Sequence, residues 1–180
     1  MTHYCLDACS LINLHCGWGG VQELHVLGGT WSTSDAAARE CRRIREFHDD
    51  GSIITRDIES AEFFRGSPLV VHAATDEEMD TAMRLAASVD DGEAECLALA
   101  KHRELVFVSD DLPAIRLAEA EGIETITFVS ILRSWVELDS TRMLQMPDIA
   151  GRISALARHV PSPSNPELRW WTRACDPSQT

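Results

Sequence analysis

The chain has 180 residues, of which 44% are hydrophobic and 25% are charged, a balance that fits one globular domain with a sizeable core. Its formal net charge of −13 excludes a generally basic nucleic-acid-binding protein. No apolar run of about 18 residues predicts a membrane span, and Asp7 interrupts the apolar stretch in which a secretory signal would need its hydrophobic region. We therefore expect a cytoplasmic protein without membrane contact.

Strand-like and helix-like segments alternate along the chain, which is the pattern of an α/β fold with a mainly parallel sheet. In the first half we expect, in order, a strand at 3–6, helices at 10–15 and 21–27, a strand at 30–33, a helix at 35–50, a strand at 52–55, a helical turn at 58–64 and a strand at 69–73. In the second half we expect helices at 76–87 and 92–102, a strand at 105–108, a helix at 111–121, a strand at 123–128 and helices at 130–138 and 148–159.

The last segment, 161–180, is rich in proline and serine, and we expect an extended or loosely ordered tail outside a domain of residues 1–160. Trp170 and Trp171 are its exception, because a double tryptophan in a polar tail either packs back on the body or meets a partner. The sequence leaves both alternatives open.

Six cysteines are spread along the chain without a CxxC pair. Because five of them lie in apolar or helical stretches, we interpret them as reduced core thiols rather than as a disulfide framework. Cys5 and Cys9 could instead join His3 or His15 around zinc, but core packing is the simpler interpretation.

Acidic residues stand where predicted strands end. Asp7 ends the first strand, and Asp110 and Asp111 follow the apolar strand at 105–108. Since the carboxyl ends of parallel strands meet at one edge of the sheet, these carboxylates should lie close together. Further acids are expected near that edge, at the start of one helix and in the second turn of another: Asp90, Asp91, Glu93 and Glu40.

Several carboxylates in one crevice repel each other and would partly protonate if nothing neutralised them. A divalent cation removes this penalty, and Mg²⁺ prefers oxygen ligands, usually one or two carboxylates together with water and substrate phosphate. Such an ion lowers the pKa of a bound water and stabilises a phosphate during in-line attack. The pattern therefore indicates a metal-dependent site for phosphodiester hydrolysis.

Each acid also has a structural interpretation. The acids that start the two later helices fit, by spacing, a D-x-x-E capping box in one case and an N-cap followed by proline in the other. Glu40 could be a solvated helix residue. Asp7 resists such an interpretation, because it interrupts an apolar strand-to-helix junction. Taken together on one edge, the acids favour a site.

Four motifs at these positions resemble those of PIN domains. YCLDACSLINL, which contains Asp7, resembles the opening of that family, and WSTSDAAARE resembles the segment that supplies its second acid, with Glu40 in the matching place. DDGEAECLALA, which contains Glu93, resembles the GEAEA-type helix of one branch of the family. LVFVSDDLPAIRLAEAEGI resembles that branch's strand, double aspartate and following helix. The resemblance covers about residues 3–160.

The resemblance implies a three-layer α/β/α sandwich and a Mg²⁺- or Mn²⁺-dependent endoribonuclease. It also implies the toxin of a toxin–antitoxin pair, a homodimer inhibited by an antitoxin protein whose segment enters the acidic site. By position, the implied metal ligands are Asp7, Glu40, Glu93 and Asp111, with Asp110 as an auxiliary acid. Ser109 would orient the site, and Arg42 or Arg43, expected on the helix of Glu40, would hold the RNA substrate by its backbone.

Other interpretations remain open. Ser34 stands where the family commonly has a proline before the helix of the second acid, and the long stretch at 41–67 holds a rival acid, Glu62. A non-catalytic PIN-like module that binds a partner protein is the main alternative, and DNA cleavage is chemically close to RNA cleavage. Receiver- and dehalogenase-type phosphotransfer domains fit poorly, because the first motif lacks a D-x-D and the only lysine, Lys101, lies in a predicted helix.

Overall fold

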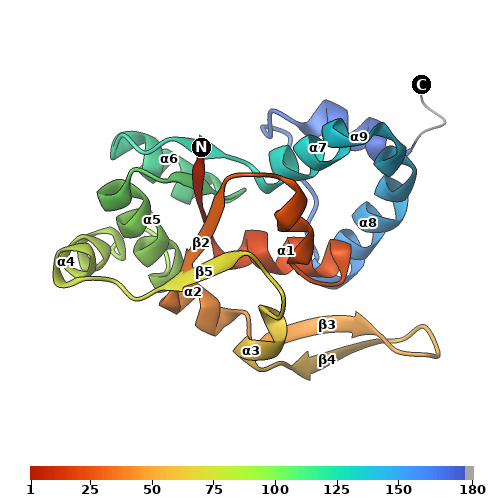
Figure 1. Cartoon of the computed structure of the whole chain (residues 1–180), viewed down its shortest axis with the longest axis horizontal. Helices are drawn as coiled ribbons and strands as arrows, with labels where there is room; N and C mark the ends of the chain where they lie inside the picture. The colour runs from red at the N-terminus through yellow and green to blue at the C-terminus, as the bar shows by residue number, and fades with distance from the viewer. Residues whose placement is uncertain (177–180) are drawn as a thin grey trace.

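A sheet of five parallel strands lies at the centre of the computed structural model, which describes residues 1–176 (Figure 1). In spatial order the strands are β5 (Leu69–His72), β2 (Thr30–Ser34), β1 (His3–Leu6), β6 (Val106–Val108) and β7 (Thr125–Ile126). Leu6 lies opposite Val108 in the register of β1 and β6, and both side chains are completely buried. Central strands that are covered on both faces are expected to be apolar in this way.

Helices cover both faces of the sheet. One layer contains α2 (Asp35–Glu40), α4 (Asp76–Leu85) and α5 (Asp91–Arg103), and the other contains α1 (Ala8–Trp18), α7 (Phe128–Leu138) and α8 (Met146–Arg152) (Figure 1). α6 (Leu112–Ala120) connects β6 to β7. The predicted three-layer α/β/α fold with a parallel sheet is therefore confirmed.

Short helical elements lie between these helices and strands or after them. They are η1 (Gln22–Val26), α3 (Ser60–Phe63), η2 (Ser140–Gln145) and η3 (Ile153–Ala157). Among residues 1–176, no helix is long and apolar enough to cross a membrane.

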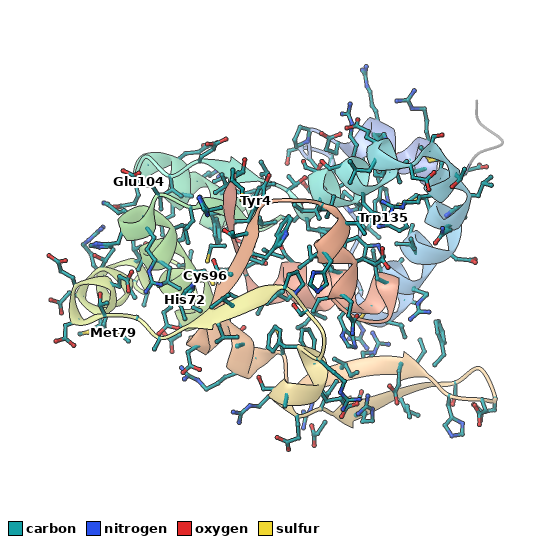
Figure 2. The ribbon with its side chains drawn as sticks, in the orientation of Figure 1. Tyr4, His72, Met79, Cys96, Glu104 and Trp135 are labelled. Atoms are coloured by element: carbon teal, nitrogen blue, oxygen red, sulfur yellow. The ribbon has the colours of Figure 1, made fainter. Side chains whose placement is uncertain are left out.

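The small residues of α5 let this helix lie close against the sheet. Cys96, labelled in Figure 2, is completely buried, and its thiol lies 3.4 Å from the carbonyl oxygen of Leu6 and 3.3 Å from the hydroxyl of Ser34. All six cysteines are free thiols, and four of them are buried, as core packing predicts. The close packing brings the N-terminus of α5 to the end of β1, where Asp7 follows.

The predicted helix over 35–50 is wrong in its second half. α2 ends at Glu40, and the next residues form β3 (Arg43–Phe47), which pairs antiparallel with β4 (Ile53–Asp57) in a hairpin (Figure 1). Arginine and glutamate favour helices locally, but β3 buries Ile44 against the body and places Arg43 opposite an aspartate of β4. Cross-strand pairing and one-sided burial thus override local propensity.

The C-terminal segment is also more ordered than predicted. Residues Leu168–Cys175 form α9, which packs on α8. Trp171 is 6% exposed, and its ring centroid lies 6.2 Å from that of Phe128, so this tryptophan packs back on the body. Trp170 is partly buried against the same core. An extended tail is therefore wrong for α9, because the helix buries one apolar face. Residues 177–180 of the predicted tail lie outside the described residues.

Candidate active site

Asp7 lies at the junction of β1 and α1 and is completely buried. One carboxylate oxygen, Oδ1, accepts a 2.6 Å hydrogen bond from the backbone N–H of Ser10, so Asp7 is the N-cap of α1. The other oxygen, Oδ2, is buried and has no hydrogen-bond partner among the described residues. Burial raises the pKa of Asp7, the nearby hydroxyl groups of Ser109 and Ser10 and the Ser10 N–H lower it, and the charge of Asp111 raises it further. A buried, unpaired carboxylate oxygen is costly, so its persistence points to a ligand.

Glu93 lies in the first turn of α5, and Asp111 is the N-cap of α6. Burial, followed by the charges of Asp90, Asp111 and Asp7, raises the pKa of Glu93 to about 7. Asp90 caps α5 by accepting a 2.8 Å hydrogen bond from the Glu93 N–H. The backbone N–H of Asp90 in turn acts on the Glu93 carboxylate and partly offsets the rise of its pKa. Asp111 caps α6 by accepting a 2.9 Å bond from the N–H of Ala114.

Glu40 reaches the same group of acids from α2. Burial, followed by the charges of Asp90 and Asp7, raises the pKa of Glu40. The rival acid Glu62 instead forms a 3.1 Å ion pair with Arg56 and lines a pocket at the C-terminal end of α1. The structure therefore brings Glu40, and not Glu62, to Asp7.

Two further residues that the sequence did not single out position Glu40. The carboxylate of Glu40 lies over Gly92, where a Cβ atom would overlap it. Glu95 is 5% exposed, and its Oε2 accepts a 2.6 Å hydrogen bond from the N–H of Ala36, which holds the first turn of α2. Both residues belong to the GEAEC motif, which was identified from the sequence. Their contacts with α2 could not be read from the sequence.

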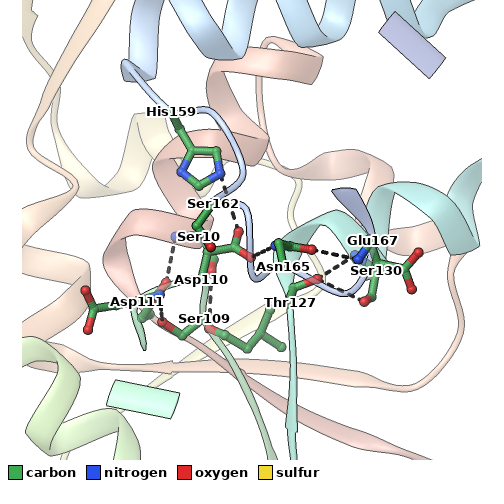
Figure 3. Close-up of polar contacts among 12 residues, drawn as sticks. Ser10, Ser109, Asp110, Asp111, Thr127, Ser130, His159, Ser162, Asn165 and Glu167 are labelled. Atoms are coloured by element: carbon green, nitrogen blue, oxygen red, sulfur yellow. Dashed lines mark hydrogen bonds and ion pairs between the residues drawn. The ribbon is translucent and has the colours of Figure 1, made fainter. Parts of the chain in front are cut away.

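Asp110 belongs to a second polar cluster (Figure 3). Its carboxylate points toward the C-terminal segment, where Asn165 Nδ2 donates a 2.8 Å hydrogen bond to Oδ1 and His159 Nε2 lies 3.7 Å from Oδ2. Burial, followed by the charge of Asp7, raises the pKa of Asp110 to about 7, and burial lowers the pKa of His159. Asp110 therefore lies near Asp7 and is held by residues of the C-terminal segment, while Asp111 points the other way (Figure 3).

The residue predicted to orient the site and the two predicted to hold the substrate lie in different places. Ser109 is completely buried, and its hydroxyl accepts a 3.0 Å hydrogen bond from the N–H of Asp111, which places it beneath the site. Arg42 is exposed between α2 and β3. Arg43 lies on β3 and forms an exposed 3.2 Å ion pair with an aspartate of β4. The prediction that both arginines share a helix with the second acid is therefore wrong, because that helix ends before them.

The chemistry of the donor set fits a hard divalent cation. Within residues 1–176, no three His, Cys, Asp or Glu side chains are gathered closely enough to form a complete metal site. Mg²⁺ needs only one or two carboxylates when water and substrate phosphate supply the remaining ligands. The unpaired oxygen of Asp7, with three neighbouring carboxylates whose charges act on one another, meets that requirement.

Comparison with known proteins assigns the chain to a family. A family model described as DUF3368, a PIN domain, matches residues 4–148, a range that contains all four converging acids and ends within α8. No curated protein and no solved structure matches the chain. The chain therefore belongs to the PIN-domain family DUF3368.

Proposed function

We propose that this protein is a metal-dependent endoribonuclease that hydrolyses RNA phosphodiester bonds. The observation that carries the proposal is the buried, unpaired Oδ2 of Asp7, surrounded by the carboxylates of Glu40, Glu93 and Asp111. Unpaired carboxylates with raised pKa values cluster at functional sites, and membership of the PIN-domain family supports a nuclease role for this one.

Mg²⁺ or Mn²⁺ would supply an activated water and would neutralise charge on the scissile phosphate. Asp7 and Asp111 are the direct ligands in this proposal, and Glu40 and Glu93 complete the site directly or through water. The positive N-terminal ends of α1, α5 and α6 face the acids and lower the cost of gathering them. In this proposal the Glu93 carboxylate would take the proton that the attacking water releases.

The cellular role we propose is that of the toxin in a toxin–antitoxin pair, acting as a homodimer and inhibited by an antitoxin protein. Family membership supports this role. The acidic site would suit an antitoxin segment with a basic side chain, because such a side chain could take the place of the cation. Growth arrest on induced expression, which an Asp7→Asn variant fails to cause, is the expected result.

Cleavage of a panel of structured and single-stranded RNAs tests the enzymatic proposal. Wild type should cleave with Mn²⁺ and fail with EDTA, and Asp111→Asn should lose cleavage because it removes a metal ligand while keeping the helix cap. Asp80→Asn is the matched control, because it makes the same change at an exposed position of α4.

No cleavage by any protein, together with no calorimetric binding of Mn²⁺, would contradict the proposal and favour a non-catalytic PIN-like module. Equal cleavage of DNA of the same sequence would show that the 2′-OH is not recognised.

A further inference from the structure

A pocket of about 420 Å³ lies at the C-terminal end of α1 and is lined by residues of this helix, the β3–β4 hairpin, α3 and the end of α8. Its charged lining consists of Arg45, Arg56, Arg65, Arg152, Glu46 and Glu62. α1 has 11 residues, so at about 1.5 Å per residue the pocket lies about 16 Å from the acidic site at the other end of the helix. A net positive pocket is unexpected in a chain whose net charge is −13.

The two glutamates neutralise only one of the four arginines. Glu46 and Glu62 both bind Arg56, with N–O distances of 3.1 Å in each case. Among residues 1–176, no carboxylate forms an ion pair with the other three arginines, Arg45, Arg65 and Arg152. Three guanidinium groups without a carboxylate partner therefore face one concave surface.

Backbone carbonyl groups hold two of these three arginines in place. Arg45 Nη1 donates a 3.2 Å bond to the carbonyl oxygen of Leu156, and Arg152 Nε donates a 2.9 Å bond to that of Cys16. A carbonyl oxygen orients a guanidinium group without cancelling its charge. Because these two arginine side chains are already held in place, they lose little conformational entropy when an anion binds.

The neighbouring titratable groups experience this positive charge. Burial lowers the pKa of His15, and the charges of Arg56 and Arg152 lower it further, although Glu46 and Glu62 oppose them. Burial raises the pKa of the Cys16 thiol to about 11, while the nearby arginines oppose that rise.

We propose that this pocket binds a phosphate group. Guanidinium groups match phosphate geometry through paired N–H donors, and arginine is favoured where a planar, bidentate contact to an anion is needed. The phosphate belongs either to the RNA backbone, a short distance from the acidic site, or to a free oligophosphate. The RNA source rests on the proposed function, whereas binding of an oligophosphate does not.

Binding measured in EDTA tests the proposal, since no cleavage is then needed. The probes are a fluorescent single-stranded RNA oligonucleotide and inorganic pyrophosphate, used with wild type, Arg45→Gln/Arg65→Gln and Arg65→Glu. Arg169→Gln is the matched control, because Arg169 is an exposed arginine of α9 outside the pocket. Arg65 is exposed and forms no ion pair in the described part of the chain, so Arg65→Glu changes the charge of the pocket without breaking an ion pair.

We expect the double variant to bind RNA about tenfold more weakly at low salt and to reduce the salt slope of binding by about 1.4, which is about 0.7 for each lost phosphate contact. Weakened RNA binding with pyrophosphate competition identifies the backbone as the source. Pyrophosphate binding that the variants abolish, without an effect on RNA, supports a free oligophosphate. Unchanged binding of both probes would overturn the proposal, whether or not the protein cleaves RNA, and so would equally tight binding of a polyglutamate peptide.

Discussion

Two groups of acidic side chains differ in this protein: those that form ion pairs with arginine or lysine, and those of the candidate active site. Glu78 on α4 is 3% exposed, and Arg103 binds both of its oxygens at 2.6 and 2.9 Å, which lowers its pKa to about 2. Hydrogen bonds from Arg84 and Lys101 likewise lower the pKa of Glu121 to about 2. At the acidic site burial and like charges act instead, and the pKa of Glu93 rises to about 7. The chain supplies Arg or Lys partners for these structural acids, whereas within residues 1–176 no Arg or Lys forms an ion pair with Glu93.

The two groups should respond to pH in opposite directions. Glu78 has a pKa below its unfolded value, so its stabilising contribution is present above pH of about 4.5 and is lost as the pH falls toward 2. Glu93 has a pKa above its unfolded value, so the folded state binds its proton more tightly. The contribution of Glu93 to stability is therefore present below pH of about 4.5 and is lost as the pH rises through 7. The acidic site should lower the free energy of unfolding at neutral pH.

Asp7→Asn should have the largest effect, because it should lose RNA cleavage and gain stability at the same time. Asparagine keeps an oxygen that can accept the Ser10 N–H bond of the helix cap, but it removes the buried charge. We expect cleavage to fall by about 10³-fold and the free energy of unfolding without divalent ions to rise by about 1 kcal/mol. RNA cleavage and urea unfolding measure the two effects. A variant that cleaves normally, or that is less stable than wild type, would contradict the assignment.

Glu78→Gln should have the reverse effect. Removing the charge leaves Arg103 without its carboxylate partner in a largely buried position, so we expect a loss of about 2 kcal/mol in the free energy of unfolding. RNA cleavage per folded molecule should not change, because the pair lies on α4 and α5 away from the acidic site. Glu77→Gln, at the exposed neighbouring position, is the control. Equal destabilisation by Glu78→Gln and Glu77→Gln would show that the ion pair with Arg103 does not stabilise the fold.

Gly92→Ala separates the position of Glu40 from its charge. The added methyl group would displace the Glu40 carboxylate, so we expect cleavage to fall by about 10- to 100-fold. Alanine favours a helix over glycine, so stability should stay level or rise by up to about 1 kcal/mol. Gly151→Ala in α8 is a close control, because a Cβ there meets no atom within 4 Å. Similar activity in the two variants would show that the contact with Glu40 does not matter.

The smallest effect we predict is on metal affinity. Because the pKa of Glu93 is about 7, its carboxyl group is mostly protonated at pH 6 and mostly ionised at pH 8. A cation that binds at pH 6 must therefore displace this proton, whereas one that binds at pH 8 meets a free carboxylate. The affinity for Mn²⁺, measured by calorimetry, should therefore rise by about tenfold over that range, with proton release greatest at the acid end. Glu93→Gln should flatten the dependence. A flat profile in wild type would indicate that Glu93 takes no part in the metal site.

Much of the candidate site could be predicted from local sequence. Asp7 and Asp111 cap helices that follow strands, Glu93 lies in the first turn of α5, and parallel strands bring such positions to one edge. The caps and the alternation of strands and helices are local properties, so the α/β class with a parallel sheet and the order of most elements followed from them. The three-layer arrangement was implied by the resemblance to PIN domains. Glu40 was harder to place, since its approach to Asp7 depends on Gly92 and on the packing of α2 against α5.

The sequence by itself thus determined the fold class and the acids at the strand ends, because both depend on residues close together in the chain. Only the tertiary structure decided that residues 43–57 form a hairpin, that Asn165 binds Asp110 across 55 residues, and that three arginines without carboxylate partners line one pocket. Each of these depends on contacts between distant segments, whose free energy outweighs local preference and leaves no periodic pattern in the sequence.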